Sequence, residues 1–330
     1  GEDLKITIDI DLQNFIDDSL NDLVGTVICM LPESGEIIAY VNNPSIDLYK
    51  ILEDYSSHDN SPYLNRAISP YEPGSIMKIP VGIMLLEEGI DPNKKYFCDG
   101  AYEFSSPNQN PKRCWKEDGH GEVDLKDAIK FSCNIYFYES VMNNYKKIYR
   151  SKWHNWMEKM GFGEKTNIDL IYEKKAQILP PSSKSKMLNM VIGQEMSTTP
   201  LQIIQMINSI FNGGTIIQPH FNHKIDVKKN DLGLQNETIK YIKNAMSAAV
   251  KSNYGTARRS NIKDMKIMAK TGTAQQGGGK MPHAWYAGGL EYNDQMLSLV
   301  IMLENGGKGG EKPADIAKEI FDKYITLNSN

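Results

Sequence analysis

The order of strand-like and helix-like segments constrains the fold of this 330-residue chain most. Apolar residues follow strand patterns near both ends of the chain, at 4–9, 24–30 and 36–41 and again at 265–269, 284–290 and 296–303. The middle third has helical spacing instead, and the expected helices there lie at 75–88, 125–143, 149–160 and 199–211. A short strand at 215–218 and further helices at 12–23, 234–251 and 313–325 complete the pattern.

This sheet, helix, sheet order predicts an α/β (α+β) fold in one domain. The first and last thirds should form one central, mainly antiparallel sheet flanked by helices, and the middle third should be an inserted all-helical lobe. We expect the sheet lobe to include residues 1–75 and 214–330, and the helical lobe residues 76–213. A site at the junction of two such lobes would lie in a natural cleft.

The charge balance and the hydrophobic runs exclude some classes of function. Basic and acidic residues number 37 and 41, so no nucleic-acid surface is expected. Uninterrupted apolar runs such as 299–303 are far too short to span a bilayer. Because the chain starts at Gly1 without a signal segment, we expect it to be part of a longer protein whose membrane anchor lies outside this sequence.

One stretch places a hydroxyl beside an amine. Pro73 and Gly74 interrupt any preceding element, and a helix can then begin at Ser75, where free backbone N–H groups favour negative charge. Lys78 lies three residues further on, on the same helical face, so a neutral Lys78 amine could take the Ser75 proton. The plainer interpretation is a helix-capping serine and a solvated lysine. The same spacing recurs at Ser183 and Ser260, without the preceding Pro-Gly stop.

Two further motifs decide between these interpretations. Ser132-Cys133-Asn134 lies within the helical pattern, and Lys270-Thr271-Gly272-Thr273 ends an apolar strand before a glycine-rich loop. A glycine without a side chain would let a substrate lie against that strand, with threonine hydroxyls on its flanks. The alternatives without a catalytic role are a turn, a Ser-Cys-Asn segment that only packs its helix, and a solvated lysine at the edge of the sheet.

The ordered trio Ser-x-x-Lys, Ser-x-Asn and Lys-Thr-Gly is typical of serine β-lactamases and penicillin-binding proteins. The likeness extends over nearly the whole chain: it includes Asn65-Arg66-Ala67, Tyr71-Glu72-Pro73, Ile192-Gly193-Gln194, Thr199-Pro200-Leu201-Gln202, Gly213-Gly214, Pro219-His220, Tyr254-Gly255-Thr256-Ala257 and Leu303-Glu304-Asn305-Gly306-Gly307. The chain therefore resembles the transpeptidase domain of a class B penicillin-binding protein. Cys114-Trp115-Lys116, Gly119-His120-Gly121 and Pro282-His283-Ala284-Trp285-Tyr286 are most similar to the elongation type, penicillin-binding protein 2, and the septal type is the nearest competitor.

The resemblance implies a role for each motif residue. Ser75 would be the nucleophile, Lys78 its general base, and Ser132 the group that passes the proton to the leaving group. Asn134 would hold Lys78 and the substrate amide, and the charge of Lys270, with burial, would lower the pKa of Lys78.

The same resemblance implies how the substrate is held. Lys270, Thr271 and Thr273 would bind the terminal carboxylate of a D-Ala-D-Ala stem peptide, with Gly272 between them. The backbone N–H groups of Ser75 and Thr273 would form the oxyanion hole, where each donor contributes roughly 3 to 4 kcal/mol in other acyl-transfer enzymes.

The competing functions differ in what happens to the acyl-enzyme. Class A β-lactamases carry a Glu-x-x-Leu-Asn segment whose glutamate activates the hydrolytic water, and here Ser185-Lys186-Met187-Leu188-Asn189 has serine in its place. The acyl-enzyme should therefore persist, which favours a penicillin-inhibited transpeptidase over a β-lactamase or a penicillin sensor. A catalytically idle interaction domain is the third alternative, and the complete trio argues against it.

A metal site is the last prediction. Cys98, Cys114, His120 and Cys133 are separated by 16, 6 and 13 residues, which matches no zinc-finger or ribbon spacing. They nevertheless form a complete Cys3His set, and Cys133 lies between two motif residues. Some elongation-type relatives bind zinc with residues at these positions, so the resemblance implies a structural zinc ion. A Cys98–Cys114 disulfide and free core thiols are the alternatives.

The resemblance also implies where and with what the protein acts. Its substrates would be peptidoglycan stem peptides, and β-lactams would be covalent inhibitors. The full-length protein would be anchored at the outer face of the bacterial cytoplasmic membrane, in the periplasm, and would support cell shape together with the glycan polymerase of the rod complex.

Overall fold

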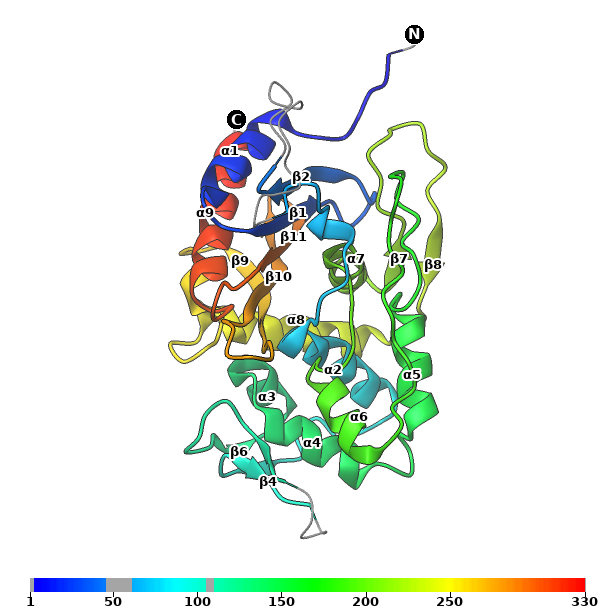
Figure 1. Cartoon of the computed structure of the whole chain (residues 1–330), viewed down its shortest axis with the longest axis vertical. Helices are drawn as coiled ribbons and strands as arrows, with labels where there is room; N and C mark the ends of the chain where they lie inside the picture. Colours follow the sequence, from blue (N-terminus) through cyan, green and yellow to red (C-terminus); the bar gives the residue numbers. More distant parts are fainter. Residues whose placement is uncertain (1–2, 46–60, 105–109, 330) are drawn as a thin grey trace.

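One central sheet organises the molecule (Figure 1). The computed structural model describes residues 3–45, 61–104 and 110–329. The sheet has the strand order β2-β1-β11-β10-β9, and every neighbouring pair is antiparallel. Its strands are β1 (Gly25–Met30), β2 (Ile37–Asn43), β9 (Lys266–Ala274), β10 (His283–Tyr292) and β11 (Gln295–Leu303). The predicted union of the first and last thirds in one antiparallel sheet is confirmed.

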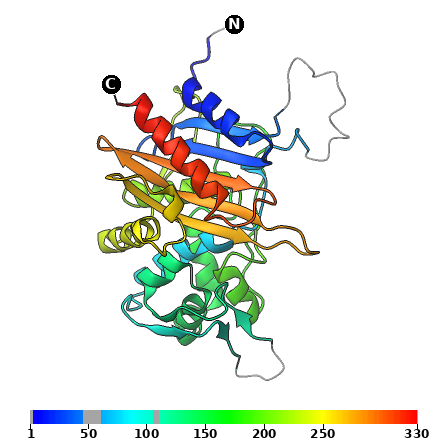
Figure 2. The ribbon, with the colours of Figure 1, turned by 90° about the vertical axis from the view of Figure 1, so that its left-hand side faces the viewer.

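Helices cover both faces of this sheet. Helices α1 (Ile10–Leu20) and α9 (Lys312–Leu327) lie across one face, as Figure 2 shows. Helix α7 (Pro200–Phe211) covers the other face, and α8 (Asn236–Lys251) packs beside β9. Along β11, Leu299 and Ile301 face the α1 and α9 layer, whereas Val300 faces the opposite core. Because both faces are buried, these strands form continuous apolar runs in the sequence.

Helix α7 begins where the sequence predicted. The Thr199 side chain accepts a hydrogen bond from the Gln202 N–H at 3.1 Å, and the Gln202 side chain accepts one from the Thr199 N–H at 2.9 Å. This reciprocal cap, with Pro200 in the first turn, satisfies donors that a buried helix end would otherwise leave unpaired. All residues of α7 are buried, so it joins the sheet to the helical part of the molecule.

The expected all-helical lobe is wrong in one respect. Its helices are α2 (Lys78–Glu87), α3 (Leu125–Phe131), α4 (Asn134–Asn143), α5 (Arg150–Lys159) and α6 (Lys184–Val191). Two small antiparallel pairs lie among them, formed by β3 (Tyr96–Cys98) with β6 (Gly121–Val123) and by β4 (Ala101–Tyr102) with β5 (Lys112–Arg113). Strands of two or three residues are too short to produce an alternating pattern, so the sequence did not reveal them.

Other expected elements also differ. Residues 4–9 form no strand and make only an isolated bridge from Ile6 to Asn222. The expected helix 125–143 is broken between α3 and α4, and α6 lies in a segment read as loop. The remaining short elements are β7 (Thr215–Ile217), β8 (Lys229–Asp231) and the 3-10 turns η3 (Arg66–Ile68), η4 (Gly74–Met77) and η5 (Arg258–Ser260).

The lobe boundaries at 75/76 and 213/214 stay a prediction, because the core is continuous across them. Residues from α2, α4, α7 and the sheet belong to one hydrophobic cluster. In the described ranges, no helix combines the length and apolarity needed to traverse a bilayer.

Candidate active site

The turn that carries Ser75 is pressed against the edge of the sheet. Gly74 has φ +53°, and a Cβ placed there would lie 2.6 Å from the Thr273 carbonyl oxygen. Only glycine combines that backbone conformation with so close an approach. The 3-10 turn η4 then leads directly into α2. Ser75, half-buried, thus lies beside the Lys-Thr-Gly strand although some 200 residues separate them.

The strand on the other side of this contact is β9, the edge strand of the sheet. A Cβ on Gly272 would meet the Pro73 carbonyl oxygen at 2.9 Å and the Trp285 Cβ at 3.0 Å. A glycine is therefore required between the turn that carries Ser75 and the neighbouring strand. Lys270 points into the interior and is fully buried, whereas Thr273 is exposed.

The Ser132-Cys133-Asn134 segment is a break between two helices. Ser132 ends α3 in the left-handed conformation, with φ 56°. The Cys133 N–H then bonds back to the Ala128 carbonyl at 2.9 Å, and α4 begins at Asn134. The sequence analysis placed these residues inside one helix, because no glycine or proline marks the break between α3 and α4. A left-handed non-glycine residue is strained, and such strain is common at functional sites.

Two buried lysines, one in α2 and one in β9, meet at the Ser132 hydroxyl. Lys78 Nζ donates to the Ser132 carbonyl oxygen at 2.7 Å, to the Ser132 Oγ at 3.1 Å and to Asn134 Oδ1 at 2.6 Å. Lys270 Nζ donates to the same Ser132 Oγ at 2.9 Å. Among the hydrogen bonds of the described residues, none joins Lys78 to Ser75, because the three acceptors on Ser132 and Asn134 surround the amine.

Burial changes the proton affinity of both lysines. It lowers the pKa of Lys78 from 10.5 to about 8, against the opposing influence of the three nearby cysteines. The pKa of Lys270 is also lowered, first by burial and then by the charge of Lys78. The sequence-based prediction named burial together with the charge of Lys270, and burial is the cause that lowers the pKa of Lys78 here. Two ammonium groups on one buried hydroxyl repel each other, which favours the loss of a proton from one of the two amines.

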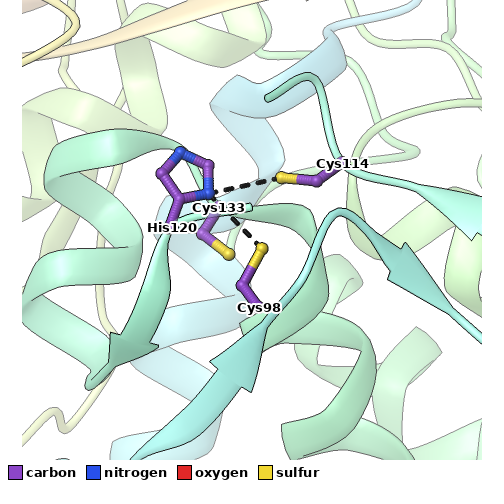
Figure 3. A group of neighbouring side chains, drawn as sticks. All are labelled: Cys98, Cys114, His120 and Cys133. Atoms are coloured by element: carbon purple, nitrogen blue, oxygen red, sulfur yellow. Dashed lines mark hydrogen bonds between the residues drawn. The ribbon is translucent and has the colours of Figure 1, made fainter. Parts of the chain in front are cut away.

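The four predicted metal ligands lie together below this site (Figure 3). The ligand atoms of Cys98, Cys114, His120 and Cys133 are all within 4.8 Å of one another. His120 Nδ1 faces the Cys98 and Cys114 sulfur atoms, each at 3.5 Å. All four thiols of the chain are free, so the alternative disulfide between Cys98 and Cys114 is not formed.

The cysteine cluster has the electrostatics of a ligand set. Hydrogen bonds shared with the Cys133 thiol lower the pKa of Cys98 and Cys114, and His120 acts in the same direction. The pKa of Cys133 is raised by the same contacts. Two thiols therefore reach the thiolate state easily, and the thiolate is the form that binds metals. The His120 ring is held by stacking on Phe131 and by an edge contact with Trp115.

Two hydrogen bonds of Asn134 join the active site to this cluster and to the strand beside it. The Asn134 N–H donates to the Cys114 sulfur at 3.4 Å, and Asn134 Nδ2 donates to the Arg113 carbonyl at 3.0 Å. The strand β5 and the residue after it thus support the same asparagine that binds Lys78. Asn134 is thus bound to the loop of the cluster by these two contacts and also follows Cys133 directly in the chain.

Two well-formed hollows among the described residues lie elsewhere. One of about 410 Å³ is lined by α1, β2 and residues 62–65, and one of about 490 Å³ by residues 4–8, Tyr40 and Phe221. Neither is lined by a residue of the Ser-x-x-Lys, Ser-x-Asn or Lys-Thr-Gly motif. The site is defined by the three motifs and their hydrogen bonds.

Comparison with known proteins assigns these motifs to a family. The model of the penicillin-binding protein transpeptidase domain matches residues 25–322. The chain belongs to this family. It is 28% identical to the peptidoglycan D,D-transpeptidase MrdA of Haemophilus influenzae, over 98% of this chain and 56% of that protein. It is 30% identical to MrdA of Acinetobacter baumannii, over 98% and 54%. The chain thus spans about half the length of these curated relatives.

Solved structures give the same result for the transpeptidase fold. The complex between penicillin-binding protein 2 and MreC from Helicobacter pylori has a TM-score of 0.89 at 26% identity, covering 99% of this chain and 64% of that one. Penicillin-binding protein 2 of Pseudomonas aeruginosa in complex with WCK 5153 also has a TM-score of 0.89, at 27% identity, covering 98% and 76%. The predicted fold class is therefore confirmed.

Sequence reasoning missed several residues that support this transpeptidase site. Lys112 Nζ donates to Asn189 Oδ1 at 2.6 Å, which holds β5 against α6. The Glu72 carboxylate accepts the Glu195 N–H at 2.9 Å, beside the nucleophile turn. No pattern marks these contacts, because the partners lie 77 and 123 residues apart.

Proposed function

We propose that this domain is a peptidoglycan D,D-transpeptidase that works through an acyl-enzyme on Ser75. The observation that supports it best is the buried Lys78 amine, whose pKa is lowered to about 8 and which shares Ser132 with Lys270. A neutral amine is the base that a serine nucleophile requires. Relatives named peptidoglycan D,D-transpeptidase match 98% of the chain.

The reaction has two acyl transfers. Lys78 takes the Ser75 proton as the hydroxyl oxygen attacks the carbonyl of the penultimate D-alanine, and the bond to the terminal D-alanine breaks. Ser132 passes the proton to the leaving nitrogen. An amine of a second stem peptide then attacks the Ser75 ester, which forms the cross-link and frees the serine.

Binding groups surround the reacting carbonyl. The Lys270 ammonium and the hydroxyls of Thr271 and Thr273 bind the terminal carboxylate of the donor, and Asn134 orients its amide. The backbone N–H groups of Ser75 and Thr273 stabilise the oxyanion. The contact of Gly74 with the Thr273 carbonyl supports this assignment, because it brings the two backbones together.

We further propose that the protein is the elongation type and acts in the periplasm, anchored to the cytoplasmic membrane. The relatives named MrdA support the type. Solved complexes of similar chains contain MreC or are described as a peptidoglycan synthase complex that coordinates polymerization and crosslinking. A rod-complex glycan polymerase is accordingly the proposed partner of the full-length protein.

Mass spectrometry after incubation with benzylpenicillin tests the catalytic proposal. We expect a stable adduct on Ser75, absent in Ser75→Ala, because the chain has serine where β-lactamases have the hydrolytic glutamate. Rapid turnover of the drug would instead assign a β-lactamase. The absence of any adduct on folded protein would assign an idle domain.

We propose separately that Cys98, Cys114, His120 and Cys133 bind a structural zinc ion. Two ligands on one tetrahedral zinc ion, at about 2.3 Å for sulfur and about 2.0 Å for nitrogen, lie about 3.5 Å apart. The two sulfur to Nδ1 distances of 3.5 Å support this fit. Four protein ligands complete the coordination, so the ion would fasten the loop to Asn134 and take no part in the reaction.

Elemental analysis of protein purified without added metal tests the zinc proposal. We expect one zinc per chain, lost in Cys98→Ser and retained in Cys29→Ser, since Cys29 lies in β1, outside the cluster. Metal-free, folded wild-type protein with full acylation activity would overturn it.

A further inference from the structure

Two sequence motifs that the reaction does not use meet behind the nucleophile turn. Arg66 of η3 comes from Asn65-Arg66-Ala67, and Glu304 follows β11 in Leu303-Glu304-Asn305. Arg66 Nε lies 2.9 Å from Glu304 Oε1, and the two side chains are 1% and 21% exposed. A buried ion pair loses much of its hydration, so it is weak evidence for a role in stability alone.

The ion pair has a third member, which points to its role. The Tyr71 hydroxyl donates to the same Glu304 Oε1 at 2.7 Å. Burial and this carboxylate raise the pKa of Tyr71, so its hydroxyl keeps its proton and remains a donor. The Arg66 guanidinium therefore holds the carboxylate, and the carboxylate in turn holds the tyrosine.

Tyr71 is fixed along its whole length. Its backbone N–H and carbonyl exchange two hydrogen bonds with Thr198, both at 2.9 Å. Its ring meets the rings of His283 and Trp285 edge to face, at centroid distances of 5.4 and 6.5 Å. Both aromatic neighbours belong to β10, which pairs directly with the Lys-Thr-Gly strand.

The contacts of Tyr71 continue into the reacting groups. Trp285 is paired with Gly272 across β10 and β9, and a Cβ on Gly272 would touch both Trp285 and the Pro73 carbonyl. Pro73 lies two residues after Tyr71 and two before Ser75. One side chain thus contacts the strand that supports the Lys-Thr-Gly motif and belongs to the segment that carries the nucleophile.

We propose that Tyr71, held by the Arg66–Glu304 ion pair, is a positioning residue that sets the offset between Ser75 and the Lys-Thr-Gly strand. The proposal rests on the proposed acyl-transfer function. Acyl transfer is sensitive to such offsets, since a misplacement of about 1 Å can cost about 100-fold in rate. The hydroxyl of Tyr71 is the group to change, because it donates the hydrogen bond to Glu304 Oε1.

The test compares two single-atom changes. Tyr71→Phe removes the hydroxyl and keeps the ring contacts. Tyr286→Phe is the matched control, because its buried hydroxyl donates to Ser260 Oγ at 2.9 Å from the opposite face of the same strand. Stopped-flow acylation by a fluorescent penicillin separates noncovalent binding from the acylation rate constant, and thermal unfolding reports stability.

We expect Tyr71→Phe to lower the acylation rate constant about tenfold with the noncovalent binding constant within about twofold. Tyr71→Phe and Tyr286→Phe should lower the melting temperature by similar amounts. Tyr286→Phe should leave the acylation rate constant unchanged. Equal acylation rate constants in Tyr71→Phe, Tyr286→Phe and wild type would overturn the proposal and leave the proposed function intact. Wild-type protein that does not acylate would refute the proposed function instead.

A double-mutant cycle with Glu304→Gln tests the stated path. If Tyr71 acts through Glu304, the loss in acylation rate in the double variant should equal the larger single loss, since both changes remove one contact. Fully additive losses would show that Tyr71 acts without the ion pair. If Glu304→Gln does not fold, the comparison of Tyr71→Phe with Tyr286→Phe still decides the main claim.

Discussion

The two walls that face Ser75 are held in different ways. The Lys-Thr-Gly wall is part of β9 and is fixed by regular pairing with β10 and by glycines that admit close backbone contact. The opposite wall, Ser132 to Asn134, is a break between helices and depends on side chains of the cysteine cluster. Backbone pairing tolerates side-chain changes away from the glycines, whereas the second wall depends on a few specific atoms.

The largest expected effect is on the sheet wall. Gly272→Val places atoms against Pro73 and Trp285, which forces the strand away from the nucleophile turn. We expect the rate of acylation by a fluorescent penicillin to fall by about 100-fold or more. Gly277→Val is the control, because no heavy atom lies within 4 Å of a Cβ at that position. Equal rates in the two variants would show that the close contact is unimportant.

The next effect concerns Lys78, whose amine bonds to Ser132 and Asn134 of the second wall. A base with a pKa of about 8 is neutral in about 1% of molecules at pH 6 and in about half at pH 8. Because only the neutral amine accepts the Ser75 proton, acylation should rise by about 50-fold over this range and flatten above about pH 9. A pH–rate profile on folded protein measures it, and a flat profile would exclude Lys78 as the base.

Chelation is expected to affect only the second wall. Removing the proposed zinc ion frees Cys114 from its ligand geometry and so loosens Asn134 through the 3.4 Å contact. We expect acylation to slow by about tenfold, as is typical when support around a site is lost. Limited proteolysis should show new cleavage between residues 98 and 133 and none in β9. Cleavage spread evenly over both walls would contradict the claim that only the second wall depends on the cysteine cluster.

The smallest effect is expected at the rim of the second wall. Lys112→Met removes the bond to Asn189 that holds β5 against α6. Because a partly exposed contact contributes at most about 1 kcal/mol, acylation should fall by about threefold. The nearby exposed Lys116→Met is the control and should have no effect. A loss as large as that of chelation would mean that Lys112, rather than the cysteine cluster, supports Asn134.

The sequence predicted the first wall better than the second, for physical reasons. Long apolar strands and the Pro-Gly stop before Ser75 are local signals, so the sheet and the nucleophile turn could be placed in advance. The break at Ser132 carries no glycine, and the later residue of the motif, Asn134, is held by Arg113 and Cys114 from a distant part of the chain. The short strands around it pair over only two or three residues, too few to give a pattern.

The sequence analysis also did not predict the contacts between residues that lie far apart in the chain. The Arg66–Glu304 pair joins residues 238 positions apart, and no spacing rule links such positions. The sequence analysis used both motifs only as signs of family likeness. Their meaning became visible once the fold brought Arg66 of η3 and Glu304, which follows β11, into contact.

The hydrogen bonds around Lys78 fix the order in which protons can move. The Ser132 carbonyl and Asn134 Oδ1 accept only, so they take both hydrogens of an uncharged Lys78. Its lone pair is then left facing the Ser132 hydroxyl, the longest of its three contacts. Transfer of the Ser75 hydrogen to Lys78 therefore requires the Ser132 hydroxyl to release this lone pair first. The resting hydrogen-bond network thus disfavours proton transfer from Ser75 until the Ser132 contact changes.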